Sequence, residues 1–272
     1  MEPPIVDDVT TDHEVPLLGG DVTDGVVRVG DTVRRPVGDH TPAVHGLLRH
    51  LAAVGFDGAP RPLGIDDRGR EILSWLPGET ARRPLPRCAV TNETLHALGR
   101  LLRRYHDAAV SYRPPPGAVW DTMASNLDQP PELVGHCDVT PENVVFRDET
   151  PYALIDFDLA RPTTRLFDVV TTLRHWAPID DPADRDPLLR RVDVGRRLAV
   201  FCAAYGLDRE RRRDLLPTAR TRFERSYAAM RERAEHLGGG WARMWEAGAG
   251  RRIRRAQDWL DHNWDDLDAR LR

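Results

Sequence analysis

The sequence predicts an α+β protein with two lobes, a small antiparallel sheet followed by a larger helical lobe. Three observations support this fold class. A hairpin of short β-branched segments lies near the start of the chain, an amphipathic helix follows it, and the chain beyond residue 77 has mostly helical periodicity. We therefore expect residues 1–77 to form an N-terminal lobe and residues 78–272 a C-terminal helical lobe.

The N-terminal lobe begins with a predicted three-stranded antiparallel sheet. Residues 26–29 and 32–35 form two strands around a two-residue turn that starts with Gly30, and a glycine at this position fits a type II′ turn. Residues 15–18 supply a third strand, joined to the hairpin through the glycine-bearing loop of residues 19–25.

A helix and one more strand complete the predicted lobe. Thr41 is a suitable N-cap, Pro42 suits the first helical position, and apolar residues recur at helical spacing until Gly55. Residues 71–76 then read as a strand that ends at Pro77. The lobe boundary is placed at this proline.

The second lobe is predicted to be helical with one exception. Residues 144–147 and 152–155 flank a turn and read as a short β-hairpin. Helices are expected around Leu95 to Tyr105 and over residues 185–205, 209–237 and 241–271.

Composition excludes several classes of protein. The formal net charge of −4 gives no general attraction to nucleic acid or to an acidic membrane, and the chain holds no long apolar run. The three cysteines are odd in number and widely spaced, which disfavours a disulfide framework or a structural metal site. We expect a cytoplasmic protein with free thiols and without a nucleic-acid or membrane partner.

The hairpin of the second lobe concentrates polar residues that could act together. Asn143 and Asp156 are symmetric about its expected turn, so we predict that they are cross-strand neighbours. An amide oxygen and a carboxylate at one point suit magnesium. Asp138, on the loop that enters the hairpin, is placed to accept a proton from a hydroxyl that attacks a metal-bound phosphate. Taken singly, each of these side chains could instead cap a turn.

The segment from Gly135 to Asn143, followed by Ile155 to Asp158, resembles the catalytic and metal-binding motifs of the aminoglycoside phosphotransferase family, small-molecule kinases related to protein kinases. The resemblance implies a protein-kinase-like fold, ATP or GTP as phosphoryl donor, Mg²⁺, and a small-molecule acceptor. It also implies roles for individual residues: His136 as loop scaffold, Asp138 as catalytic base, Asn143 and Asp156 as magnesium ligands, and Asp168 as a brace for the loop backbone.

The resemblance also implies a nucleotide site in the first lobe. The glycine loop would cover the phosphates, and the adenine would lie near residues 73–76. The residues assigned to this site are Gly19, Gly20, Gly25, Leu73, Trp75 and Leu76. Arg34 takes the place of the phosphate-binding lysine of kinases, because the chain contains no lysine.

The helix that should supply a glutamate to this cation carries Val44 and His45 instead. This departure keeps a second reading open, a nucleotide-binding pseudokinase with a regulatory role. A third reading is a metabolic kinase of the same fold that acts on choline, a sugar or homoserine. His106, which follows Tyr105, is interpreted as a helix C-terminal histidine.

The acceptor is predicted to be cationic. Asp258, Asp261, Asp265 and Asp268 follow helical spacing and would form an acidic stripe. The resemblance implies an acceptor site built from acids of the helical lobe, so Asp158, Asp261 and Asp265 are the candidates. A solvated acidic face is the alternative.

Overall fold

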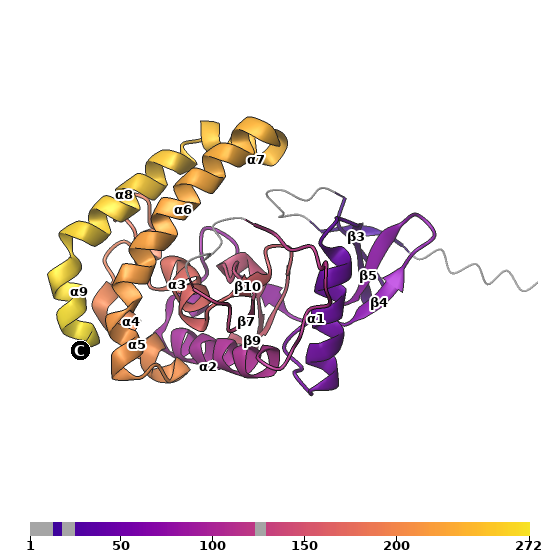
Figure 1. Cartoon of the computed structure of the whole chain (residues 1–272), viewed down its shortest axis with the longest axis horizontal. Coiled ribbons are helices and arrows are strands. Elements are labelled where there is room, and N and C mark those ends of the chain that lie inside the picture. The colour runs from indigo at the N-terminus through magenta and orange to yellow at the C-terminus, as the bar shows by residue number, and fades with distance from the viewer. Residues whose placement is uncertain (1–12, 18–24, 123–128) are drawn as a thin grey trace, which may run out of the picture.

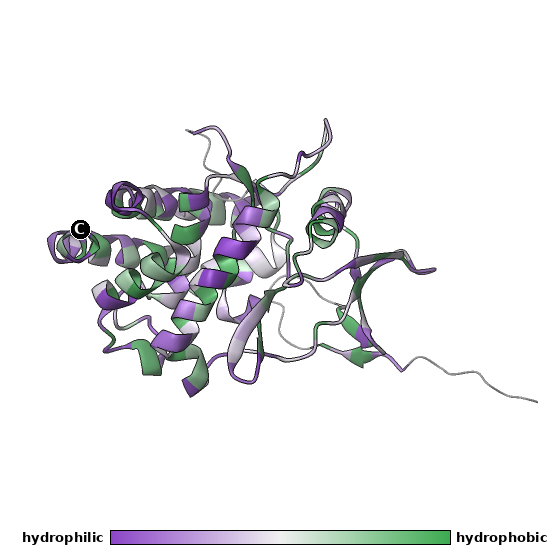
Figure 2. Cartoon of the chain, turned by 90° about the horizontal axis from the view of Figure 1, so that it is seen from below, coloured by the Kyte–Doolittle hydropathy of each residue, from purple (hydrophilic) through white to green (hydrophobic). Residues whose placement is uncertain are grey.

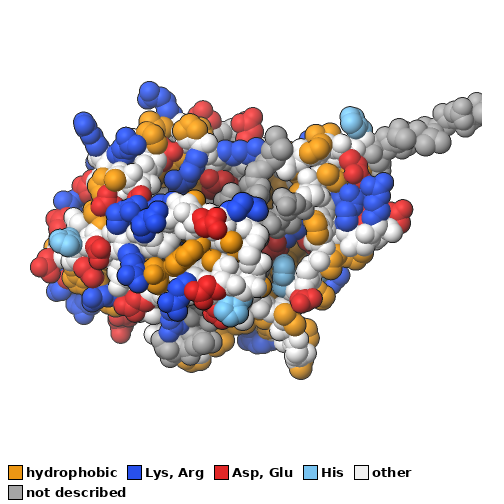
Figure 3. All heavy atoms as spheres, turned by 90° about the horizontal axis from the view of Figure 1, so that it is seen from above, with side chains coloured by type: hydrophobic (Ala, Val, Ile, Leu, Met, Phe, Trp, Pro, Cys, Tyr) orange, Lys and Arg blue, Asp and Glu red, His pale blue; other side chains and the backbone are white. Residues whose placement is uncertain are grey.

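The structure is a computed structural model that describes residues 13–17, 25–122 and 129–272. It confirms the predicted α+β class, with an antiparallel sheet and α1 at one end and the other helices at the other end (Figure 1). No helix of these residues is long and apolar enough to cross a membrane. In the view of Figure 3, arginines and acids are interspersed over the surface.

The first sheet has five strands in the order β1-β2-β3-β5-β4. Its strands are β1 (Val15–Pro16), β2 (Val27–Val29), β3 (Thr32–Pro36), β4 (Pro62–Ile65) and β5 (Arg70–Ser74). Val29 pairs with Thr32, which confirms the two-residue turn, and Gly30 has the expected positive φ of 55°. The sequence did not predict β4, whose pairing with β5 shifts register between Pro62 and Gly64.

Helix α1 (Thr41–Ala53) packs its apolar face inward, with Leu47 and Leu51 fully buried. The helix begins one residue earlier than the predicted cap implies. His40 occupies the cap position, and the Thr41 hydroxyl accepts a hydrogen bond from the Gly38 N–H at 2.9 Å. Such one-residue shifts are common at helix ends.

Two small sheets lie at the base of the helical part. Strand β6 (Glu79–Thr80) pairs with β8 (Val144–Arg147), which forms the predicted hairpin with β9 (Thr150–Leu154), while β7 (Leu133–Gly135) pairs with β10 (Arg161–Thr163). Because β6 begins two residues after Pro77 and joins this second group, the strand pairing changes near the boundary placed at Pro77. The division into lobes at that residue stays a prediction.

The remaining helices are α2 (Asn92–Ala109), α3 (Arg165–Trp176), α4 (Val194–Tyr205), α5 (Arg209–Arg213), α6 (Leu215–His236), α7 (Gly239–Glu246), α8 (Ala249–His262) and α9 (Trp264–Leu271). Three of the predicted helical segments are interrupted, α2 is longer than expected, and α3 was not predicted. Gly99 of α2 permits close contact with α4, since a Cβ there would lie 3.0 Å from that of Ala204. Figure 2 shows hydrophilic and hydrophobic residues alternating around these helices.

Candidate active site

The loop between β7 and β8 is held by a buried carboxylate at the start of α3. Asp168 accepts hydrogen bonds from the backbone N–H groups of His136 at 2.8 Å and Cys137 at 2.9 Å. Burial acts to raise the pKa of Asp168, but the hydrogen bond from His106 and these N–H groups hold it below its usual range. Cys137 has a positive φ of 62°, a conformation that needs such external support. The structure thus places Asp168 where the resemblance expects a brace.

His106 is the predicted helix C-terminal histidine, and it also contacts the brace. It lies in the last turn of α2, as expected, and its Nε2 is 3.0 Å from the Asp168 carboxylate and its Nδ1 is 2.6 Å from the Tyr205 hydroxyl. The side chain therefore connects α2 and α4 to the brace. The carboxylate also needs Gly135, because a Cβ at that position would lie 2.8 Å from its Oδ2.

His136 is a fully buried, neutral part of the loop. Its Nε2 lies 3.0 Å from the carbonyl oxygen of Ile155, its Nδ1 accepts from the Asp138 N–H at 3.3 Å, and its ring lies 4.4 Å from that of Phe157. Burial lowers its pKa. These contacts assign the proton to Nε2, and they fit the scaffold role implied by the resemblance.

Asp138 lies at the centre of the site. Asn143 Nδ2 donates to its Oδ2 at 2.8 Å and to its carbonyl oxygen at 2.9 Å. Burial, and then the nearby charge of Asp156, raise the pKa of Asp138 to about 7. A carboxylate with a pKa near neutrality can accept a proton from a hydroxyl at physiological pH.

The predicted register of the hairpin was wrong by one residue. Its turn is Asp148-Glu149, with φ values of 50° and 59°, and a register shift follows after Val145. As a result, Asn143 faces Ile155, whose N–H donates to its carbonyl oxygen at 2.9 Å, and Asp156 comes one position later. The prediction from the sequence did not allow for two consecutive acidic residues that both adopt positive φ in a tight turn.

The oxygen donors of Asn143 and Asp156 nevertheless fit a magnesium ion. Asn143 uses its Nδ2 for Asp138, so its amide oxygen is the atom left for a metal. Asp156 has a positive φ of 62°, and its side chain is 42% exposed. No cluster of three or more His, Cys, Asp or Glu side chains that could hold a metal occurs among the described residues. Magnesium typically binds through one or two carboxylates together with substrate phosphates and water.

The structure places Arg35, rather than Arg34, beside these acids. Arg35 is 8% exposed, and its guanidinium contacts Glu71 at 2.7 Å, Asp156 at 3.1 Å and Asp158. Arg34 is 3.9 Å from Asp66, a side chain of the β4–β5 turn. Successive side chains of a strand point to opposite faces, so assigning the cation one residue too early selected the wrong face of β3.

An acid does accompany this cation, but it comes from a strand. Glu71 lies opposite Arg35 in the pairing of β3 with β5, and it is 3% exposed. Its other carboxylate oxygen is 2.7 Å from Nε2 of His45, which comes from α1. The helix thus contributes His45 where an acid was expected, and Glu71 lies between the histidine and the arginine. The sequence signal was a lone glutamate inside an apolar strand.

The predicted nucleotide residues fall into two groups. Gly19 and Gly20 lie outside the described residues, whereas Gly25 is described and has a positive φ of 81°. Leu73, Trp75 and Leu76 are all partly buried at the end of β5. The indole of Trp75 lies under the Arg28 guanidinium at 4.4 Å. The placement of the adenine near residues 73–76 stays a prediction.

The predicted acceptor acids do not gather at one place. Asp158 contacts Arg35, and its carboxylate is 3.2 Å from His40 Nε2. Asp261 pairs with Arg220 at 3.2 Å on α8, and Asp265 is an exposed residue of α9, at the outer edge of the helical part (Figure 1). A helix break at Asn263 separates Asp261 from Asp265, so the acidic stripe is not continuous.

Comparisons with known proteins agree with the geometry. A model described as the phosphotransferase enzyme family matches residues 15–118 and 117–215. The trifolitoxin immunity protein of Rhizobium leguminosarum bv. trifolii is 33% identical over 276 residues, covering 95% of this chain and 98% of the relative. The homoserine kinase of Xanthobacter autotrophicus is 30% identical over 173 residues, covering 51% of this chain and 54% of the relative.

Two solved structures share the fold at low identity. A choline/ethanolamine kinase family protein from Mesorhizobium loti has a TM-score of 0.62 and 14% identity, covering 97% of this chain and 94% of the other. The GDP complex of an aminoglycoside 2′-phosphotransferase has a TM-score of 0.55 and 14% identity with the same coverage. The two-lobe kinase-like fold implied by the resemblance is thereby confirmed.

Proposed function

The chain belongs to the phosphotransferase enzyme family, and from this premise we propose that it transfers the terminal phosphoryl group of a nucleoside triphosphate to a hydroxyl of a small molecule. One observation carries the proposal. Asp138 has a pKa raised to about 7, and its carboxylate is held by Asn143 on a loop that Asp168 braces. Asp138 then has both the protonation behaviour and the fixed position that a general base requires.

The proposed reaction is an in-line displacement. The acceptor oxygen attacks the terminal phosphorus, a new O–P bond forms, and the bond to the bridging oxygen breaks, so a nucleoside diphosphate leaves. Asp138 accepts the hydroxyl proton. His136 and Asp168 hold the loop that positions this carboxylate. A magnesium ion held by Asn143 and Asp156 would neutralise the negative charge on the transferred phosphate.

The environment of Arg35 bears on the pseudokinase alternative. That alternative rested on the missing glutamate of α1, but Glu71 supplies a buried carboxylate to Arg35. Arg35 is accordingly the cation that we assign to the nucleotide phosphates. Arginine can contact phosphate through two parallel N–H donors. The missing helix glutamate, which favoured a catalytically inactive protein, is therefore compensated by the ion pair between Arg35 and Glu71.

The two curated relatives suggest different acceptors. The relative that covers 95% of this chain is an immunity protein against a toxin, whereas the homoserine kinase aligns with 51% of it. The coverage favours protection against a toxin as the biological role, with phosphorylation of the toxin as its mechanism. A metabolic kinase of the homoserine type is the second candidate.

The deciding experiment measures nucleoside diphosphate release from ATP or GTP with magnesium and a panel of hydroxyl-bearing acceptors. The panel contains L-homoserine, choline, amino sugars and peptide antibiotics. We expect acceptor-dependent turnover that Asp138→Asn reduces at least about 100-fold, the usual contribution of a general base. Nucleotide binding should persist in that variant. Turnover by Asp138→Asn at about a tenth of the wild-type rate or more would contradict this role.

A further inference from the structure

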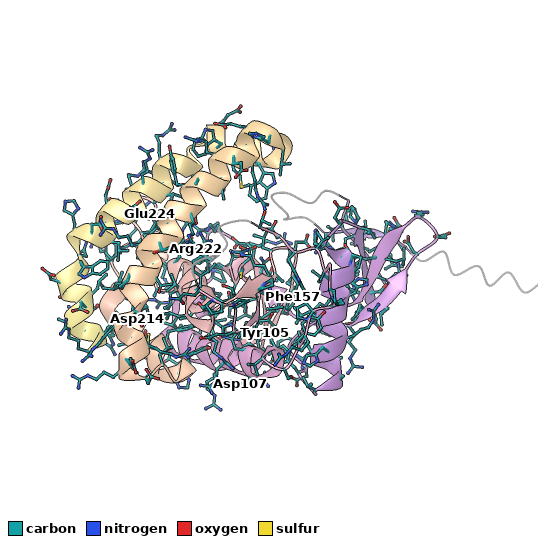
Figure 4. The ribbon with its side chains drawn as sticks, in the orientation of Figure 1. Tyr105, Asp107, Phe157, Asp214, Arg222 and Glu224 are labelled. Atoms are coloured by element: carbon teal, nitrogen blue, oxygen red, sulfur yellow. The ribbon has the colours of Figure 1, made fainter. Side chains whose placement is uncertain are left out.

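A second group of arginines acts on the site: the charges of Arg161 and Arg222 act on Asp138, and the charge of Arg174 acts on Arg222. This group, here called the arginine cluster, consists of Arg161 of β10, Arg174 of α3 and Arg222 of α6. Arg222 is 7% exposed and Arg161 is 2% exposed. Arg222 belongs to the stretch of α6 that runs beside α3 (Figure 4).

The members of the cluster repel one another. Burial, followed by the charges of Arg174 and Arg161, lowers the pKa of Arg222 to about 9. Asp138 and the Cys137 thiol act in the opposite direction, and Arg222 and Arg161 in turn act to lower the pKa of Asp138. Like charges brought together in a buried place are unfavourable unless an anion offsets them.

Two N–H donors of the cluster have no hydrogen-bond partner among the described residues. Arg222 Nε donates to the Thr171 hydroxyl at 3.0 Å, but its Nη1 is buried without a hydrogen bond. Arg161 Nη1 donates to the Leu159 carbonyl at 2.8 Å, while its Nε is also buried and unpaired. A buried donor left without a partner is costly.

The carboxylates of the described part do not neutralise Arg222. Within those residues, no Asp or Glu oxygen lies within 4.0 Å of its nitrogens. Arg161 is 3.8 Å from Asp121, and that carboxylate is bound more closely by Arg233, at 2.6 Å. The cluster therefore has more positive charge and more donors than the surrounding chain satisfies.

We propose that Arg222 and Arg161 form an oxyanion site for a carboxylate or phosphate group carried by the acceptor. The proposal rests on the proposed phosphotransferase function, because it assumes that the acceptor binds between Asp138 and the arginine cluster. An acidic group bound there would satisfy the unpaired donors and offset the repulsion. It would also fix the distance between that group and the hydroxyl that Asp138 deprotonates.

The geometry favours the acceptor over the nucleotide as the source of this anion. Arg35, Asp156 and Asp158 contact one another at the side of the site that faces the first sheet. Arg222 instead hydrogen-bonds to α3 and belongs to α6, so both of its attachments lie in the helical part. The acidic stripe expected to bind a cation is split between α8 and α9, so a cationic acceptor stays a prediction.

A binding experiment tests the anion site without knowledge of the acceptor. Melting temperature is measured with sodium sulfate or sodium chloride at equal ionic strength, for wild type, Arg222→Met and Arg220→Met. Arg220 is the matched control because it lies on the same helix and is exposed, paired with Asp261. We expect an extra stabilisation by sulfate in wild type and Arg220→Met that Arg222→Met lacks. Equal sulfate effects in all three proteins would overturn the proposal.

Folding of the variants is not expected to limit the test. Replacing Arg222 by methionine removes a repelled charge, so its melting temperature in chloride should be close to wild type or above it. Arg222→Lys provides a second variant that keeps the charge and loses the forked donors. Arg222→Lys should retain part of the stabilisation by sulfate. If Arg222→Met retained all of this stabilisation and Arg222→Lys lost it, the anion site would be contradicted.

Kinetics then distinguish the acceptor from the nucleotide. L-homoserine and 3-aminopropan-1-ol differ by one carboxylate, and further pairs of hydroxy acids and their amides extend the comparison. We expect wild type to prefer the acids, and Arg222→Met to raise their KM at least about tenfold, as for loss of a charged hydrogen bond, with little change for the amides. The Kd of a non-hydrolysable ATP analogue should stay within about twofold.

Each failure has a distinct signature. A weakened Kd for the ATP analogue in Arg222→Met, with no acceptor preference, would assign the site to the nucleotide phosphates and overturn the proposal. Wild-type preference for the amides would overturn it as well. Absence of transfer to every acceptor, with the sulfate effect intact, would contradict the proposed phosphotransferase function while the anion site stands.

Discussion

Replacing Arg35 by methionine should destabilise the protein far more than the same change at Arg34. Arg35 is 8% exposed and is the cation shared by Glu71, Asp156 and Asp158, and Glu71 is itself 3% exposed. Removing one partner from a buried ion pair typically costs about 3–5 kcal/mol. For a chain of this size, that corresponds to a fall in melting temperature of roughly 6–20 °C.

Arg34→Met is the matched control, one residue away on the other face of β3. The Arg34 guanidinium is 3.9 Å from Asp66, whose carboxylate is already bound by Arg70 at 2.8 Å. One Arg34 nitrogen is buried without a partner, so its loss removes an unsatisfied donor. The expected change is within about 1 kcal/mol.

The assays are thermal unfolding followed by circular dichroism and titration calorimetry with the magnesium complex of a non-hydrolysable ATP analogue. Arg35→Met should also weaken nucleotide binding, whereas Arg34→Met should not. Equal melting temperatures for the two variants would refute the assignment of the buried ion pairs. Weaker nucleotide binding in Arg34→Met alone would restore the prediction made from the sequence.

Three further outcomes are expected. Asp156→Ala should reduce the magnesium dependence of nucleotide binding in calorimetry, and unchanged dependence would exclude Asp156 as a ligand. Asp168→Asn should lower stability by about 3 kcal/mol, because the brace loses charge and one acceptor. The pKa of Asp168 is lowered in the folded protein, so its stabilisation is complete above about pH 5 and is lost as the pH falls through the folded-state pKa. The melting temperatures of wild type and Asp168→Asn should therefore converge in acid. Gly135→Ala should cost about 1–3 kcal/mol and reduce turnover, because its Cβ would lie 2.5 Å from Thr163 and 2.8 Å from the brace; wild-type turnover at full stability would show that the loop adapts.

The fold class and the loop around Asp138 could be predicted because their signals are local. The hairpin at Gly30 follows from turn chemistry within a few residues, and the spacing of His136, Asp138 and Asn143 lies within one loop. Local spacing determined which residues gather there. It did not determine the register of β8 with β9, because the turn at residues 148–149 uses acidic residues where glycine or asparagine is usual.

The two surprises at this ion pair, Arg35 in place of Arg34 and Glu71 in place of a helix acid, have a common cause. The cation beside Asp156 and Glu71 is Arg35 and not the expected Arg34, and a shift of one residue in a strand moves a side chain to the other face. Its acid was then sought on α1, whereas Glu71 reaches Arg35 through the pairing of β3 with β5. Strand pairing is a non-local property, and the sequence had assigned no partner to residues 71–76.

The helix breaks misled the prediction of the acceptor. Asp261 and Asp265 follow helical spacing in the sequence, but the chain turns at Asn263 between α8 and α9. Conversely, Arg222 is only 7% exposed, although it lies in a stretch of α6 rich in arginine. Helical periodicity could not identify it, because the side that α6 presents to α3 depends on packing between distant segments.

Arg35 and Arg222 show how the same residue type can have opposite electrostatic roles on either side of Asp138. Carboxylates surround Arg35, and although burial lowers its pKa, the charges of Asp158, Asp156 and Glu71 raise it overall. Arg222 is surrounded by other arginines, and burial and repulsion lower its pKa to about 9. The first charge is satisfied by the fold and stabilises it, whereas the second is unsatisfied until a ligand binds. A buried charge kept at a cost to stability is expected where function requires it, so Arg35→Met should lower the melting temperature, whereas Arg222→Met should leave it close to wild type or raise it.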